Sequence, residues 1–383
     1  MKKVAIICEF NPFHNGHKLL FDRVRAFFAP EEVCLVCIMS GNFVQRGTLS
    51  VMSKYKRAEI AADMGADLVL ELPFPYSASY AQSFARAGVH IASSLGDIEY
   101  LAFGSESNDG EKILDCAEKL ASAEFENALS DMLKESRNTS EPYASVRSRV
   151  FEKLYGKELL SKPNDILAIE YLLAISDSGS NIKPLFIRRD KDFSASESRG
   201  YIYSGDASLE HVIPESVYEK TVSAEKFPQH LPDAALVLFL ANSEAIDVAC
   251  ASEMNFDLAS RLVSAARSGK YKTVKDLLSA VATKKYTHAR IRRALNNAFL
   301  GVKASELENM PEYTVLLSSS EAGRRALREF SKSAKINILA TKSAHNKLDG
   351  LAAEQYALSE KADRTFYFFA SENTSENKPY VKK

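Results

Sequence analysis

Apolar and polar positions alternate in a regular order over the first 110 residues. Short, nearly continuous apolar runs are separated by stretches with helical periodicity, and several of these stretches end at a glycine. The runs predict strands at 4–8, 33–40, 67–73 and 99–105, and the periodic stretches predict helices at 17–28, 53–66 and 83–96. Strands that alternate with helices in this way are typical of a doubly wound, parallel α/β sheet of the Rossmann-like type.

The pattern changes further along the chain. Residues 111–160 read as charged helices, 164–177 as an apolar helix, 182–190 as a last strand and 194–206 as a helix or turn. Beyond about residue 207 the strand signal mostly vanishes, although 311–341 mixes both periods. We therefore expect an α/β domain over 1–208 and a mainly helical domain over 209–383, with Pro214 as a hinge.

The composition narrows the class of protein. With 46% hydrophobic and 26% charged residues, the 383-residue chain is an ordinary globular one. No apolar stretch is long enough to span a bilayer, and the apolar run at the N-terminus is too short for a signal peptide, so a soluble cytoplasmic protein is expected. The net charge of -1 means that any nucleic acid must be bound by a local basic patch.

The five cysteines do not indicate a metal centre. Cys34 and Cys37 form a C-x-x-C pair, but it lies inside an apolar strand, where residues three apart face opposite sides of the sheet. There is no second C-x-x-C pair and no C-x-x-H. Buried, structural thiols are favoured over redox or metal use, and no metal ligands are predicted.

The candidate chemistry lies where the predicted strands end. The segment His14-Asn15-Gly16-His17 follows the first strand and opens a helix. Unpaired backbone N–H groups and the helix dipole make such a position an anion site, and two imidazoles add hydrogen-bond donors for phosphate oxygens. Two solvent-facing histidines or a metal pair are the alternatives. The strand-to-helix context favours phosphoryl chemistry.

A second segment complements the first. Residues 194–199, Ser-Ala-Ser-Glu-Ser-Arg, offer hydroxyl groups and an arginine at a late helix N-terminus. The sequence His-Asn-Gly-His resembles the H-x-G-H signature of the nucleotidyltransferase superfamily, and the serine-rich turn resembles its second signature. The resemblance implies a HUP-type fold and attack of a substrate anion on the α-phosphate of a nucleoside triphosphate, with pyrophosphate as the leaving group.

Longer blocks resemble one branch of that superfamily. EFNPFHNGH, MSGNFVQRG, SKYKRAEIAADMGADLVLELPF, FGSE and PNDILAIEYL, which together span most of residues 1–205, are similar to the tRNA(Met) cytidine acetate ligase family. The match of the C-terminal half is looser. The resemblance implies that ATP and acetate form acetyl-adenylate, and that the acetyl group passes to N4 of the wobble cytidine of elongator tRNA(Met).

The same resemblance implies an ATP site. Its members would be Ile7, Cys8, Glu9, Phe10, Asn11, Pro12, Phe13, His14, Asn15, Gly16, His17, Lys18, Leu19, Leu20, Gly104, Asn164, Arg188, Arg189, Ser196 and Arg199. His14, His17 and Lys18 would be the catalytic groups, and Mg²⁺ is expected on the triphosphate. The sequence leaves open which of Arg188 and Arg189 contacts ATP, although Arg189 better fits the family pattern. Asn164 is also a candidate N-cap for the helix that follows it.

A substrate loop is expected after the second strand. Ser40, Gly41, Asn42, Gln45 and Arg46 suit a turn that closes on a ligand, and a plain surface turn is the alternative. Lys54 and Arg57, on one face of the next helix, would reach a phosphate unless they are only exposed helical charges. For the walls of the acetate pocket we expect three aromatic residues: Phe10, Phe13 and Phe43.

The tRNA surface is predicted from local charge. Basic residues crowd one short stretch of this neutral chain, and a second cluster follows: Lys284, Lys285, His288, Arg290, Arg292 and Arg293, then Arg324, Arg325 and Arg328. Such clusters supply salt-dependent phosphate contacts, and a solvated basic helix face is the alternative.

The chain departs from the family pattern at Cys8, Phe10 and Val315. The resemblance therefore supports adenylation chemistry more strongly than it supports tRNA as the acceptor. A nucleotidyltransferase for a small cofactor is one alternative function. An RNA-binding protein with a vestigial nucleotide site is another. The oligomeric state is left open.

Overall fold

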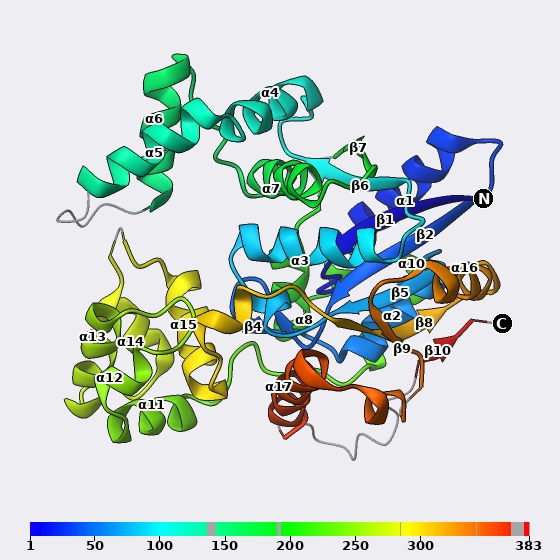
Figure 1. The fold of residues 1–383 in the computed structure, drawn as a ribbon. Coiled ribbons are helices and arrows are strands. Elements are labelled where there is room, and N and C mark those ends of the chain that lie inside the picture. Colours follow the sequence, from blue (N-terminus) through cyan, green and yellow to red (C-terminus); the bar gives the residue numbers. More distant parts are fainter. Residues whose placement is uncertain (136–142, 190–192, 284, 342, 369–378, 383) are drawn as a thin grey trace.

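One mixed sheet forms the centre of the protein (Figure 1). The computed structural model describes residues 1–135, 143–189, 193–283, 285–341, 343–368 and 379–382. The sheet order is β10-β8-β5-β2-β1-β6-β7, with β9 beside β8. The strands are β1 (Lys2–Cys8), β2 (Val33–Ser40), β5 (Leu68–Leu72), β6 (Tyr100–Ser105), β7 (Lys183–Arg188), β8 (Tyr313–Ser319), β9 (Asn337–Leu339) and β10 (Tyr380–Val381).

The central strands are parallel and buried on both faces. β1 pairs in parallel with β2 and β6, and every residue of β2 is buried. Alternate residues of β1 enter different cores: Ala5 and Ile7 face one cluster, and Val4 and Ile6 face the other. This two-sided burial explains why these strands read as continuous apolar runs. The predicted doubly wound α/β class is confirmed.

Helices cover both faces of the sheet. On the Val4 face lie α1 (Asn15–Phe28), α2 (Lys54–Asp63) and α10 (Glu215–Ser223). On the Ala5 face lie α3 (Ala81–Ser94), α7 (Pro163–Ser178) and α16 (Glu321–Ser333). Between β6 and α7 the chain inserts α4 (Gly110–Leu120), α5 (Ala123–Glu135) and α6 (Tyr143–Tyr155), whose apolar residues extend the same core.

The helices of residues 233–300 form a helical body with its own core, to the left in Figure 1. It contains α11 (Asp233–Asn242), α12 (Ala245–Val248), α13 (Phe256–Arg267), α14 (Val274–Val281) and α15 (His288–Leu300). The helix α17 (Gly350–Tyr367) contributes Ala362 and Phe366 to this core. Shorter elements are α8 (Ala195–Ser204), α9 (Leu209–Val212), β3 (Phe43–Val44), β4 (Thr48–Leu49) and the 3-10 turns Tyr76–Ala78, Ala304–Leu307 and Ala344–Lys347.

The sheet does not end at residue 208, where the sequence analysis placed the boundary. α10 packs against α2, and the chain returns after the helical body to add β8, β9 and β10. β8 pairs antiparallel to β5, and Oγ1 of Thr314 donates a hydrogen bond to the carbonyl of Glu71. An antiparallel neighbour needs no helical crossover, so the strand–helix alternation that marks the parallel strands in the sequence does not mark β8.

Cys34 and Cys37 are buried without a disulfide, as predicted for structural thiols. No helix in the described part of the chain is long and apolar enough to cross a membrane.

Candidate nucleotide site

The turn between β1 and α1 is built from its own two histidines. His14 is the N-cap of α1, and its Nδ1 accepts a hydrogen bond from the backbone N–H of Gly16 (3.1 Å). Nδ1 of His17 accepts a hydrogen bond from the backbone N–H of His14 (3.2 Å). The two rings stack with centroids 3.7 Å apart. A Cβ at residue 16 would lie 3.0 Å from the His14 ring, so glycine allows this packing.

These contacts set the protonation of both rings. An Nδ1 atom that accepts a hydrogen bond carries no proton, so each neutral ring holds its proton on Nε2. Burial, followed by the charges of Arg189 and Arg199, lowers the pKa of His14 to about 4. Burial and the neighbouring His14 hold the pKa of His17 well below its usual range. Both rings line the cavity as neutral imidazoles, each with an Nε2–H left to donate.

The cavity above this turn has a volume of about 370 Å³ and lies at the carboxyl ends of β1, β6 and β7. Its lining includes many of the predicted ATP residues: Ile7, Cys8, Glu9, Phe10, Asn11, His14, Gly16, His17, Leu19, Leu20, Gly104, Asn164, Arg188, Arg189, Ser196 and Arg199. Ligands in open α/β sheets bind at this edge. Among the described residues, no group of three or more His, Cys, Asp or Glu side chains forms a metal site.

Arginines supply the positive charge of the cavity. Arg199, in the first turns of α8, donates to the carbonyl of Asn11 (2.6 Å) and to Oγ of Ser196 (3.2 Å). Its buried Nε has no hydrogen-bond partner among the described residues. Arg189 lies close enough to His14 to lower the pKa of that ring, and both Arg188 and Arg189 line the cavity. The site therefore gathers cations and neutral donors, which suits a polyanionic ligand.

Asn164 lies at the rim, where its Nδ2 donates to Oε1 of Glu106 (2.9 Å). The N-cap predicted for this residue is wrong: α7 begins at Pro163 with Lys162 as its N-cap, because proline favours the first helical position. Glu106 belongs to the FGSE segment but is not among the residues predicted to bind ATP. Phe84 and Tyr171 are further lining residues that sequence reasoning missed, since only the packing of α3 and α7 brings them to the cavity.

Several predicted residues lie outside the lining of the cavity. Lys18 forms an ion pair with Asp22 on the exposed side of α1, and Asn15 donates to the carbonyl of His211. Pro12 and Phe13 are also outside the lining, and Phe13 packs beneath α1. Of the three expected acetate-pocket walls only Phe10 lines the cavity, and Phe43 belongs to the core of the helical body.

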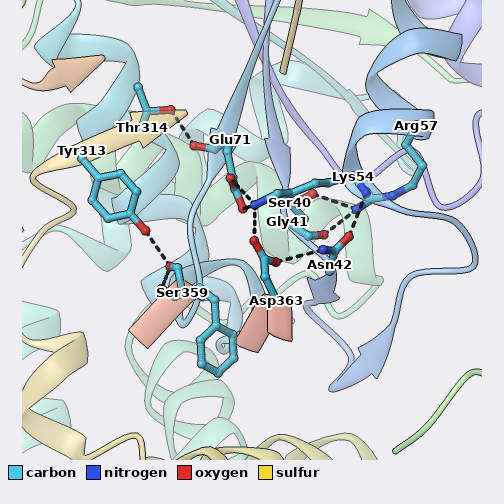
Figure 2. A network of polar contacts seen from close by, with 11 residues as sticks. Ser40, Gly41, Asn42, Lys54, Arg57, Glu71, Tyr313, Thr314, Ser359 and Asp363 are labelled. Carbon is cyan, nitrogen blue, oxygen red and sulfur yellow. Dashed lines mark hydrogen bonds and ion pairs between the residues drawn. The ribbon is translucent and has the colours of Figure 1, made fainter. Parts of the chain in front are cut away.

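The predicted substrate loop divides into two parts. Gln45 and Arg46 line the cavity, and the backbone N–H of Gln45 donates to Oε1 of Glu9 (2.8 Å). Ser40, Gly41 and Asn42 face a buried polar network instead (Figure 2).

Lys54 and Arg57 are part of that network rather than of the cavity. Lys54 contacts Glu71 (2.7 Å) and Asp363 (2.6 Å), and Arg57, which is fully buried, donates to the carbonyls of Ser40 and Gly41. Neither side chain is free to hold a phosphate.

The predicted tRNA residues are largely engaged within the protein. Arg293 forms an ion pair with Glu253 (2.6 Å), and Arg290 and Lys285 lie over the ring of Tyr286. Arg292 donates to the carbonyl of Arg46 (3.4 Å), beside the cavity. Lys284 lies outside the described residues. The second cluster, Arg324, Arg325 and Arg328, lies on α16, on the opposite side of the molecule from α15 (Figure 1).

The fold and the cavity define an α/β protein of the nucleotide-binding class, with an H-x-G-H turn in the lining of the cavity. The model of the family described as HIGH Nucleotidyl Transferase matches residues 1–380. A protein from Caldanaerobacter subterraneus named tRNA(Met) cytidine acetate ligase is 32% identical, over 91% of this chain and 90% of its own. A protein of the same name from Acetivibrio thermocellus is 31% identical, over 88% of both chains. The chain belongs to the family of the tRNA(Met) cytidine acetate ligases.

Two solved structures of a Thermotoga maritima protein have the same fold as this chain. The crystal structure of Thermotoga maritima TmcAL bound with alpha-thio ATP superposes with a TM-score of 0.91, at 27% identity over the whole of both chains. The apo form of the same protein gives a TM-score of 0.89.

Proposed function

We propose that the protein activates acetate with ATP and transfers the acetyl group to N4 of the wobble cytidine of elongator tRNA(Met). The observation that carries the proposal is the pair of neutral histidines, joined by a hydrogen bond from the backbone N–H of His14 to Nδ1 of His17, in the lining of a cavity that also contains Arg189, Ser196 and Arg199. The relatives that bear the ligase name, and the neighbour with a bound ATP analogue, support it.

The first step needs no nucleophile from the protein. A carboxylate oxygen of acetate attacks the α-phosphorus, the bond from that phosphorus to the β-bridging oxygen breaks, and pyrophosphate leaves. Mg²⁺ on the triphosphate would neutralise part of the charge of this leaving group. The Nε2–H groups of His14 and His17 donate to the α-phosphate oxygens, whose negative charge rises as the reaction proceeds. Arg199, Ser196 and Arg189 hold the β- and γ-phosphates. Lys18 is paired with Asp22 and lies outside the lining of the cavity, so the proposed step does not rely on it.

In the second step N4 of the cytidine attacks the carbonyl carbon of acetyl-adenylate. AMP leaves, and the nitrogen releases a proton. The reaction therefore needs an opening through which a base within a large RNA reaches the cavity.

The rim formed by Arg46 and Arg292 fits such an opening. Arg46 lines the cavity, and Arg292 of the helical body lies directly beside it. Burial, and after it the charges of Arg293 and Arg46, lowers the pKa of Arg292. A phosphate of the RNA backbone placed between Arg46 and Arg292 would relieve their repulsion.

The test is to incubate the protein with labelled acetate and ATP, with and without elongator tRNA(Met). We expect acetate-dependent exchange of pyrophosphate into ATP without tRNA, and label on the tRNA when it is present. Exchange without transfer of label would remove the tRNA assignment but keep adenylation. Salt-sensitive tRNA binding with no exchange would contradict an enzymatic role.

A further inference from the structure

A tyrosine among the residues that line the cavity carries a hydroxyl group that the proposed nucleotide site does not use. Tyr171 lines the cavity, its side chain belongs to the core on the α3 face of the sheet, and only 3% of the residue is exposed. Its OH has no hydrogen-bond partner among the described residues. A buried hydroxyl without a partner costs about 1–3 kcal/mol, so its presence at a cavity points to a ligand.

The position of Tyr171 on α7 places it at a distinct part of the cavity. Asn164, Leu167 and Tyr171 are spaced by three and four residues, so they share the face of α7 that lines the cavity. Asn164 is at the rim, against Glu106. Tyr171 lies two turns further along the helix, close enough to Cys8 and Glu9 that their charges act on its hydroxyl. It therefore lies beside the end of β1, immediately before the turn of residues 14–17, the proposed phosphate turn.

Apolar side chains surround the ring of Tyr171 at the cavity. Ile7, Phe84 and Phe103 line the cavity from the same core cluster, and the rings of Phe103 and Tyr171 lie 5.5 Å apart. Ile7 is pressed against α3, because a Cβ at Gly88 would come within 2.6 Å of its Cδ1. The niche thus has no room to deepen behind Ile7.

Two arginines lie within the electrostatic reach of the neighbouring Glu9. Oε1 of Glu9 accepts from the backbone N–H of Gln45, and Arg57 donates to the backbone carbonyl of Glu9. Glu9 opposes the fall in the pKa that burial causes at both Arg57 and Arg199. An anion beside Tyr171 would therefore meet these two cations as well as the carboxylate.

We propose that this niche, formed by Tyr171, Ile7, Phe84 and Phe103, is the site of the acyl substrate. Tyr171 donates its O–H to one carboxylate oxygen of acetate, the methyl group contacts Ile7 and Phe84, and the other oxygen faces the phosphate turn. The proposal rests on the proposed function, because it assigns the carboxylate that attacks ATP. In this proposal the niche takes the place of Phe13 and Phe43, which were expected to form the walls of the acetate pocket. The niche is closed behind Ile7, and this limits the acyl chain of the substrate to a short one.

Tyr171→Phe tests the hydroxyl. In acetate-dependent pyrophosphate exchange we expect the KM for acetate to rise about tenfold, as for the loss of one buried hydrogen bond. The KM for ATP should stay within twofold. Tyr155→Phe is the matched control, since its hydroxyl bonds to Ser122 and to the carbonyl of Lys119, away from the cavity. An unchanged KM for acetate, or an equal rise in the KM for ATP, would overturn the assignment.

Phe84→Leu tests the apolar wall without depending on the hydroxyl. A shorter side chain should raise the ratio of kcat/KM for propionate to that for acetate about tenfold, which is typical for a one-methylene change in a pocket. The ratio is measured within one preparation, so partial loss of folded protein does not affect it. Phe125→Leu, at a buried position on α5 in the same core, should leave the ratio unchanged.

The failure of this proposal is distinguishable from failure of the proposed function. If wild-type protein shows no acetate-dependent exchange, the acetate ligase assignment fails and the niche loses its substrate. If exchange is present and neither Tyr171→Phe nor Phe84→Leu changes the response to the carboxylate, the function stands and the niche is refuted.

Discussion

At the scale of single residues, backbone N–H groups hold the two histidines in one tautomer. Nδ1 of His14 accepts from Gly16 and Nδ1 of His17 accepts from His14, so the side chains at the start of α1 are also the proposed catalytic donors. Neutral imidazoles that each present an Nε2–H stabilise negative charge without proton transfer.

We expect His17→Ala to lower the rate of pyrophosphate exchange by about 10²–10³, the usual effect of removing one preorganised donor. The affinity for tRNA should change by no more than a few-fold, because the phosphate turn and the Arg292 rim are separate. His211→Ala, at an exposed position, serves as control. An equal loss of exchange and of tRNA binding would contradict separate sites.

The low pKa of His14 predicts a pH dependence of stability. The ordinary value is 6.5 and the folded value is about 4, so the unfolded chain binds more protons between these pH values. The free energy of unfolding of the ligand-free protein therefore rises with pH across this window, and this contribution is lost as the pH falls from 6.5 through 4.

In His14→Asn, which keeps a residue able to cap α1, the slope of stability against pH between 4 and 6.5 should fall by up to about 1 kcal/mol per pH unit. Urea titrations at several pH values measure it. An unaltered slope, with His211→Asn as reference, would count against a buried neutral His14.

At the scale of elements, α15 is fixed directly to the loop at the edge of the cavity. Nδ2 of Asn296 donates to the carbonyl of Gly47 (3.1 Å), and Arg293 donates to the carbonyl of Gln45 (3.3 Å). The backbone of Gly47 has a φ of +69°, and a Cβ there would lie 2.7 Å from the backbone nitrogen of Arg293. Only glycine permits this close approach.

Gly47→Ala should therefore separate α15 from the loop, raising the KM for ATP and lowering the Tm. Gly156 offers a matched control, because its φ of +61° is similar but a Cβ there meets nothing within 4 Å. Gly156→Ala bears only the backbone strain of about 1 kcal/mol. Thermal unfolding of both variants isolates the contact, and equal shifts in Tm would argue against it.

At the scale of the whole molecule, one buried network joins four parts of the chain (Figure 2). Lys54 of α2 lies between Glu71 at the end of β5 and Asp363 of α17. Nδ2 of Asn42 donates to Asp363 (2.9 Å), which ties the loop after β2 to the same group. Burial raises the pKa of Glu71 to about 7, with Asp363 adding to the rise and Lys54 opposing it.

Removal of the cation should lower the free energy of unfolding more than removal of one anion does. Lys54→Met leaves two carboxylates without their partner in a buried site, and we expect a loss of about 3–5 kcal/mol in the free energy of unfolding. Asp363→Asn keeps the Lys54–Glu71 pair and should cost about 1–2 kcal/mol, since Asp363 is also partly exposed. Denaturant titration measures both, and the reverse order would show that the network is not organised around Lys54.

The sequence by itself determined the alternation of strands and helices, the phosphate turn and its serine-rich partner. These features are local: periodicity reports burial, and a strand followed by a helix N-terminus needs no distant residue to form an anion site.

Only the tertiary structure decided which charges are free. Lys54 and Arg57 looked like phosphate ligands on a helix face, but Glu71, Asp363 and loop carbonyls from distant segments surround them. The antiparallel β8 and the face of α7 that carries Tyr171 into the cavity likewise depend on contacts between segments far apart in the chain. Pairing, burial and access are properties of the packed molecule, and a local pattern does not contain them.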